Sequence, residues 1–256
     1  MSNVPENVLS RERRDSLVLL LAWTAGSVDA IGFLGLNHVF TANMTGNTVL
    51  MGLTLGQGHG LAAISNVIAL LGFGMGVALG AVIAGRGGQA GHWDRRITGA
   101  VFLEGIMLAA FTVLWHAAPG GAGRSSAVLY LLIALSALAM GIQSAAVRRL
   151  NLPGVATTYV TGTITTLIAG LTSRMRLAPP PAAEQDATPQ PAPDKHHAAL
   201  QAGVFLTYGL SAVLSGLFQM RVPWLVAVTP LFAVALVLFF VFLSHRQQQS
   251  RHEAIS

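Results

Sequence analysis

Apolar residues gather in long stretches that are separated by short polar segments. A stretch of about 20 apolar residues is long enough to span the ~30 Å hydrocarbon core of a bilayer as an α-helix. Six stretches have this length: 17–36, 61–84, 97–116, 127–147, 198–220 and 224–243. The pattern therefore predicts an all-α, polytopic membrane protein with six transmembrane helices. A cleaved secretory signal is the alternative for the first stretch, but Asp29 interrupts its apolar run and five further spans follow.

Two further apolar stretches, at 38–55 and 154–172, are rich in Thr, Asn and Gly. Each is too short and too polar to form a simple span, so we expect a different structure for both. Later in the chain, residues 178–197 contain six prolines in twenty positions and have no apolar face. Because proline interrupts helices and nothing apolar is available for packing, this segment is predicted to be a disordered loop.

The composition supports a membrane protein and excludes two other classes. Hydrophobic residues make up 53% of the chain and charged residues only 10%, where soluble proteins average about 25% charged. The mean hydropathy is +0.60. So few charged side chains cannot cover a water-soluble domain, and a disordered chain requires low hydrophobicity and high charge. The sequence has no cysteine, which excludes disulfides and thiolate metal sites.

An internal repeat relates the two halves of the chain at an offset of 116 residues. The offset aligns Leu34 with Leu150, Leu36 with Leu152, Val39 with Val155, Thr41 with Thr157, and Thr45-Gly46 with Thr161-Gly162. Chance is the alternative, because these residue types are common here, but every match falls in or just before the Thr- and Gly-rich stretch of its half. Each half then has three long spans and one short segment. Because three is an odd number, the two repeats are predicted to have inverted topology.

The distribution of Lys and Arg decides between two topologies. If both short segments enter the membrane and return to the same side, thirteen of the fifteen Lys and Arg residues are cytoplasmic, and only Arg124 and Arg221 are external. If both segments cross, nine are inside and six outside. The positive-inside rule favours two re-entrant half-helix segments, with both termini cytoplasmic. The predicted divisions are a tail at 1–16, membrane repeats at 17–116 and 127–243, an external loop at 117–126 and a tail at 244–256.

Two runs of the sequence are similar to a known family. They are AGSVDAIGFLGLNHVFTANMTGNTVLMG at 25–52 and MGIQSAAVRRLNLPGVATTYVTGT at 140–163. Together they resemble the YoaK-like family of bacterial membrane proteins, a domain family of unknown function. The resemblance implies a multi-spanning protein of the bacterial inner membrane and brings no reaction, substrate or active site. The second Thr-Gly pair is followed by Thr163 where the first has Asn47, so the halves need not be chemically equivalent.

Two acidic residues lie inside the predicted spans. Ionisable side chains at membrane depth are costly and generally face a cavity or a partner. Asp29 lies about 12 residues into the first span, or ~18 Å, and Glu104 lies about seven residues into the third. The functional interpretation makes Asp29 a solute or proton site and Glu104 a relay or gate. The structural interpretation has each residue bonded to a neighbouring helix.

The two Thr-Gly segments indicate a site at the membrane midplane. Irregular backbone survives at that depth only where protein or water satisfies its polar groups. We expect the chain to enter extended, turn at Gly46, and leave as a helix over 47–55, about 14 Å long and capped by Thr45 or Asn47. The second segment repeats this from the opposite face, so that two positive helix ends converge and Gly46 approaches Gly162. Polar surface turns are the alternative.

The candidate residues of a solute pathway follow from these segments. They are Asp29, Asn43, Thr45, Gly46, Asn47, Gln143, Thr161, Gly162 and Thr163, with Glu104 as a relay. For Gln143 the alternative is a hydrogen bond that joins two helices. Small residues recur at four-residue spacing, at Gly72, Gly76 and Gly80 and at Ala137, Gly141 and Ala145. These Gly-rich faces are predicted to be packing seams and, in part, the contact face of a homo-oligomer.

Signatures of catalysis are absent from the sequence. The eight histidines lie almost entirely in loops or at span ends, and neither an HExxH motif nor a phosphate-binding loop occurs. We therefore expect no enzyme activity, metal or cofactor. The pI near 10.7 reflects arginines that anchor the chain to lipid head groups, so nucleic acid is not an expected partner. The sequence predicts a channel or secondary transporter for a small polar or anionic solute, and a non-transporting scaffold or sensor subunit is the alternative.

Overall fold

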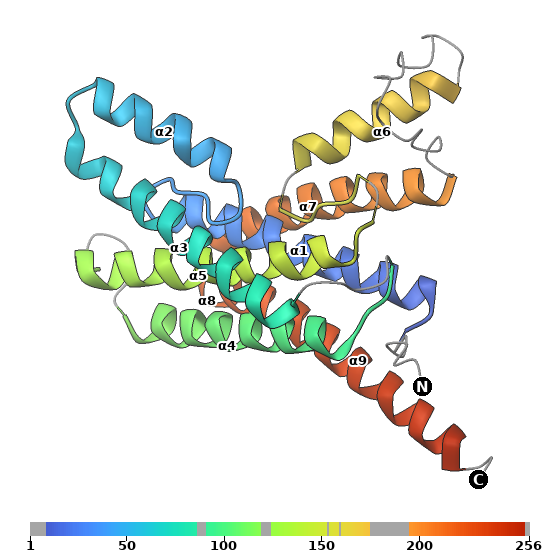
Figure 1. The fold of residues 1–256 in the computed structure, drawn as a ribbon. Helices are drawn as coiled ribbons and strands as arrows, with labels where there is room; N and C mark the ends of the chain where they lie inside the picture. Colours follow the sequence, from blue (N-terminus) through green and yellow to red (C-terminus); the bar gives the residue numbers. More distant parts are fainter. Residues whose placement is uncertain are drawn as a thin grey trace.

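The computed structural model of the chain describes residues 9–85, 91–118, 124–152, 154–158, 160–174 and 195–253. Within these residues all regular secondary structure is helical, in nine helices (Figure 1). The helices are α1 (Arg11–Gly35), α2 (Met44–Gly56), α3 (Gly60–Ala84), α4 (Arg95–Ala117), α5 (Ser126–Arg149), α6 (Val160–Arg174), α7 (Lys195–Arg221), α8 (Pro223–Val226) and α9 (Val228–Glu253).

Six helical segments in the described part of the chain are long and apolar enough to cross a membrane. They are Arg11–Gly35, Ala63–Ala84, Arg95–Ala117, Ser126–Arg149, Lys195–Arg221 and Pro223–Gln247. Each coincides with one of the six predicted apolar stretches. The last of them includes both α8 and α9, because the helix is interrupted between Val226 and Val228. The predicted all-α, polytopic class is therefore confirmed.

Several spans begin at a polar residue ahead of the apolar stretch. Ser10, Asp94 and Ser125 each precede a helix, and each side chain accepts a hydrogen bond from the backbone N–H three residues later. Such capping satisfies one of the four N–H groups that a helix start leaves without a partner. The helices consequently extend beyond their apolar runs into the polar flanks.

The long helices of the first half of the chain pack mainly against long helices of the second half. Helix α3 packs against α5 and α7 against α1, while α4 packs against α5 and α9 against α1. Each short helix packs against the long helix that follows it, α2 against α3 and α6 against α7. In Figure 1, α2 and α6 begin near the middle of the bundle and extend toward its opposite ends. The start of α1 and the end of α9 share one end of the bundle, where Arg13 donates hydrogen bonds to Ser244 and Gln247.

Small residues form the seam between α3 and α5. A Cβ atom added to Gly141 would lie 2.9 Å from the Cα of Gly76, and one added to Gly80 would lie 2.8 Å from the Cβ of Ala145. The missing side chains let the two backbones approach closely. The predicted packing seam is thus found within one chain. The expected homo-oligomer through these faces stays a prediction.

Two polar side-chain contacts join neighbouring elements at the end of the bundle that holds the chain termini. Arg149 lies 2.6 Å from Asp94 and donates a second hydrogen bond to the Gly85 carbonyl. His196, in the first turn of α7, lies 2.5 Å from Asp15 of α1. These contacts position the starts of α4 and α7 against the rest of the bundle.

Two predicted boundaries are corrected by the structure. The short helix predicted over 47–55 begins earlier, at Met44, because Asn43 supplies the capping side chain. The loop predicted over 178–197 ends earlier, because Lys195 already belongs to α7. Residues 178–194 lie outside the described part of the chain.

Candidate functional site

Asp29 of α1 holds the segment that precedes α2. Its Oδ1 accepts hydrogen bonds from the backbone N–H groups of Thr41 at 2.7 Å, Ala42 at 2.6 Å and Asn43 at 3.3 Å. Its Oδ2 accepts a hydrogen bond from the Tyr208 hydroxyl of α7. Because Asp29 is buried and lies six residues before the end of α1, it fixes this segment about 9 Å below that end. The carboxylate thus satisfies backbone groups that have no helical partner.

Two asparagines shape the start of α2. The Asn43 side chain accepts a hydrogen bond from the Gly46 N–H at 3.2 Å, so Asn43 is the N-cap in place of the predicted Thr45 or Asn47. Asn47 is fully buried and makes a two-way contact with Phe40. Its Oδ1 accepts from the Phe40 N–H at 2.9 Å, and its Nδ2 donates to the Phe40 carbonyl at 2.5 Å. Asn47 therefore folds the preceding segment back onto the helix.

Gly46 lies inside the first turn of α2, so the predicted turn at this residue is wrong. A Cβ atom at this position would lie 2.8 Å from Cδ2 of Phe40, which leaves no room for a side chain. The glycine is required by this close approach of the Phe40 ring. Thr45, beside it, is exposed. The expected approach of Gly46 to Gly162 stays a prediction.

The segment before α6 is held by a neutral side chain. Gln143 of α5 is fully buried. Its side-chain nitrogen, Nε2, donates to the Thr157 hydroxyl at 2.8 Å and to the Leu21 carbonyl at 3.0 Å. Gln143 lies six residues before the end of α5, about 9 Å from that end. Thr163, in the first turn of α6, is buried and its hydroxyl lies 3.4 Å from the Ala156 carbonyl, to which it donates.

The two segments match at the offset of 116 residues found in the sequence. Asn47 donates to the carbonyl of Phe40, and Thr163 donates to the carbonyl of residue 156, which is 116 positions after Phe40. Thr45 and Thr161 are both exposed, and Gly46 and Gly162 are both half-buried. The two halves differ in the anchoring side chain, which is a carboxylate in the first half and an amide in the second.

Glu104 of α4 has a very different environment from Asp29. Its side chain is fully buried, and neither carboxylate oxygen has a hydrogen-bond partner. A buried polar group without a partner is costly, and an ionised one is costlier still. Glu104 thus differs from Asp29, whose oxygens accept four hydrogen bonds.

Two cavities lie at opposite ends of α5, and each contains an arginine. One, of about 330 Å³, adjoins the segment before α6 and is lined by Ser144, Arg148 and Thr157. The other, of about 570 Å³, is lined by Arg124 and other residues near the start of α5. Partial burial lowers the pKa of the Arg124 guanidinium, which nevertheless stays charged at neutral pH. Both cavities thus offer positive charge and polar groups.

Tyr208 is the site residue that the sequence does not reveal. It lies in an apolar span and is separated from Asp29 by 179 positions, so no local pattern joins the two. A tyrosine within a span, whose hydroxyl needs a polar partner when buried, is the one available signal. In the described part of the chain, no group of three His, Asp or Glu side chains could hold a metal ion.

The fold and its six apolar helices define a multi-pass membrane protein. The family described as "Protein of unknown function (DUF1275)" matches residues 17–244, and the chain belongs to this family. The chain is also 37% identical over 162 residues to the UPF0700 transmembrane protein YoaK of Bacillus subtilis (strain 168), which covers 63% of this chain and 69% of that protein. The resemblance to YoaK-like proteins is therefore confirmed. No solved structure matches the chain.

Proposed function

We propose that this protein is a channel or secondary transporter for a small polar or anionic solute in the bacterial inner membrane. In this proposal α2 and α6 are re-entrant half-helices of two inverted repeats, and both termini are cytoplasmic. The solute site lies between the first turns of the two half-helices, where the predicted site residues Thr45, Gly46, Thr161 and Gly162 are located.

One observation carries the proposal. The segments before α2 and α6 are held by buried side chains well inside the bundle, and the first turn of each helix nevertheless has an exposed threonine, Thr45 or Thr161. Asp29 and Gln143 hold the preceding segments about 9 Å from the ends of α1 and α5. In a hydrocarbon core of ~30 Å, tethers at opposite faces leave about 10 Å of depth between them. Lipid cannot satisfy polar backbone at this depth, so the exposed turns around Thr45 and Thr161 require water or solute.

The packing pattern supports the inverted repeat. Exchanging α1, α2, α3 and α4 for α5, α6, α7 and α9 converts the pair α3–α5 into α7–α1, α4–α5 into α9–α1 and α2–α3 into α6–α7. All of these pairs are observed, and the pair α4–α9 is converted into itself. Because each half has three spans, this exchange places the two half-helices on opposite faces of the membrane. The charge distribution supports the same topology, since it leaves only Arg124 and Arg221 on the external side.

The charge around the proposed site favours anions and neutral polar molecules. Helix N-termini carry a partial positive charge and present N–H donors. The cavities at the two ends of α5 add Arg124 and Arg148, which would attract an anion from either side. The oxygens of Asp29 already accept four hydrogen bonds from the protein, so we assign it to holding the segment. We retain Glu104 as the relay in a proton-coupled mechanism, because its oxygens have no protein partner.

Reconstitution into liposomes tests the proposal. We expect the protein to accelerate uptake of members of a panel of small anions and uncharged polar solutes above the rate in protein-free liposomes. Thr45→Val and Thr161→Val should each lower the rate several-fold, because each removes a hydroxyl from the proposed site. Thr54→Val is the matched control, since Thr54 lies at the far end of α2 and its hydroxyl bonds to its own helix.

The alternative is a non-transporting scaffold or sensor subunit. It is favoured by the complete use of the Asp29 oxygens within the protein. Folded protein that leaves the permeability of the liposomes unchanged for the whole panel, with and without a proton gradient, would support this alternative and overturn the transport proposal.

A further inference from the structure

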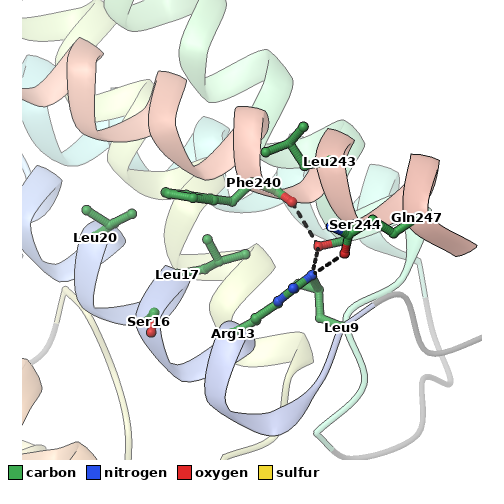
Figure 2. A pocket seen from close by; sticks show the side chains of 9 residues that line it. All are labelled: Leu9, Arg13, Ser16, Leu17, Leu20, Phe240, Leu243, Ser244 and Gln247. Carbon is green, nitrogen blue, oxygen red and sulfur yellow. Dashed lines mark hydrogen bonds between the residues drawn. The ribbon is translucent and has the colours of Figure 1, made fainter.

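A groove lies between the start of α1 and the end of α9, at the end of the bundle that holds both chain termini (Figure 2). Its volume is about 320 Å³. Helix α1 contributes Arg13, Leu17 and Leu20, and helix α9 contributes Phe240, Leu243 and Gln247. Figure 2 shows Arg13 pointing from α1 toward Ser244 and Gln247, with Leu17 and Phe240 further along the two helices. We call this feature the α1–α9 groove.

The groove crosses the boundary between polar and apolar sequence on both helices at the same level. On α1 the charged and polar residues end at Ser16, and the apolar run begins at Leu17. On α9 the apolar run ends at Leu243, and polar residues begin at Ser244. The hydrogen bond from Arg13 to Ser244, 3.2 Å long, fixes the two boundaries beside each other. One end of the groove is therefore polar, and the other is apolar over about 5 Å of each helix, from Leu17 to Leu20 and from Phe240 to Leu243.

Arg13 supplies a positive charge that no carboxylate in the described residues neutralises. Its Nη1 donates to the Ser244 hydroxyl and to the Gln247 side-chain oxygen at 3.0 Å, and both partners are uncharged. The next residue differs, because Arg14 pairs with the carboxylate of Asp15 at 2.7 Å. The neutral partners orient the Arg13 guanidinium without cancelling its charge, and they leave donors for a further acceptor.

We propose that the α1–α9 groove binds an anionic phospholipid, with its phosphate at Arg13 and one acyl chain along Leu17, Leu20 and Phe240. An arginine beside an apolar groove matches the two parts of this ligand, because guanidinium groups bind phosphate by paired hydrogen bonds. The location suits a lipid of the leaflet that faces the chain termini. A free phosphate would leave the apolar part unfilled, and a lipid without net charge would leave Arg13 uncompensated. This inference does not depend on transport.

The test uses the purified, delipidated full chain and measures binding by native mass spectrometry and by the rise in thermal stability. The probes are phosphatidylglycerol, phosphatidylcholine with the same acyl chains, and inorganic phosphate. We expect phosphatidylglycerol to bind about tenfold more tightly than phosphatidylcholine, and Arg13→Gln to remove this preference. Arg11→Gln is the matched control, because Arg11 is exposed in the same helical turn and does not line the groove.

A second variant separates a lipid site from a simple anion site. Leu20→Trp should obstruct the apolar part of the groove and weaken phosphatidylglycerol binding while Arg13 is intact. If inorganic phosphate competes equally well with the lipid, or if Leu20→Trp has no effect, the groove is not a lipid site. Equal binding of the two lipids, or an equal loss in Arg11→Gln, would also overturn the proposal. If Arg13→Gln does not fold, Arg13→Lys keeps the charge, and a retained preference for phosphatidylglycerol then supports it.

Discussion

The two buried acids should respond differently to the same chemical change. Asp29→Asn and Glu104→Gln each replace a carboxyl group by an amide of nearly equal size. In Asp29 the carboxylate accepts four hydrogen bonds, including backbone bonds of 2.6 and 2.7 Å, whereas the Glu104 oxygens have no partner. We therefore expect Asp29→Asn to lower the free energy of unfolding and Glu104→Gln to leave it nearly unchanged.

The size of the Asp29→Asn effect can be estimated from the geometry. Hydrogen bonds to a charged group contribute about 1.5–3 kcal/mol and are roughly twice as strong as bonds between neutral groups. Losing the charge should therefore weaken the two short backbone bonds by ~1 kcal/mol each, while the 3.3 Å bond to Asn43 adds little. In membranes the loss is reduced, because the unfolded chain also finds partners. We expect a decrease of ~1–2 kcal/mol for Asp29→Asn and less than ~0.5 kcal/mol for Glu104→Gln.

Unfolding by a denaturing detergent in mixed micelles, followed by tryptophan fluorescence, measures both values, because the chain contains four tryptophans. Tyr208→Phe provides an independent check, since it removes only the hydroxyl that donates to Asp29. Its effect should be smaller than in Asp29→Asn, and the double variant should show that the two losses are not additive. Equal destabilisation by Asp29→Asn and Glu104→Gln would refute the assignment of Asp29 as the residue that holds the segment.

Three further predictions concern close packing and topology. Gly46→Ala should destabilise the protein by ~1–3 kcal/mol, because its Cβ would lie 2.8 Å from the Phe40 ring. Gly141→Ala should cost at least as much, since its Cβ would overlap the backbone of α3. Gly52→Ala, with no neighbour within 4 Å, is the control for both and should be stabilising by up to ~1 kcal/mol in the same unfolding assay. Single cysteines at Ser125 and Ala183, treated with an impermeant reagent on intact cells, should be labelled at 125 only, and the reverse pattern would contradict the proposed topology.

The spans were predictable because membrane helices follow from the length of an apolar run. Backbone groups in hydrocarbon must be satisfied within the segment, so about 20 apolar residues form a helix whatever their neighbours are. The packing of α3 on α5 was predictable for a related reason. Glycine at four-residue spacing, as at Gly72, Gly76 and Gly80, places these three small residues on one helix face.

The start of α2 could not be predicted, because the local sequence offers several equivalent caps. Asn43, Thr45 and Asn47 are all residue types that cap helices well. Asp29 binds the N–H groups of residues 41–43 and so holds this segment outside the helix. The side chain of Asn43, the last of the three residues, then caps α2. The choice thus depends on a side chain of another helix.

The sequence by itself determined the membrane class, the number of spans and the residues that distinguish the two short segments. These features depend on the run length, spacing and type of residues, all of which are local properties of the chain. Only the tertiary structure decided that Asp29 is bonded to Tyr208, that Glu104 has no partner and that Gln143 bonds to Thr157. Hydrogen bonding depends on which donors packing brings within about 3 Å, and apolar spans of similar composition do not specify their neighbours through composition alone.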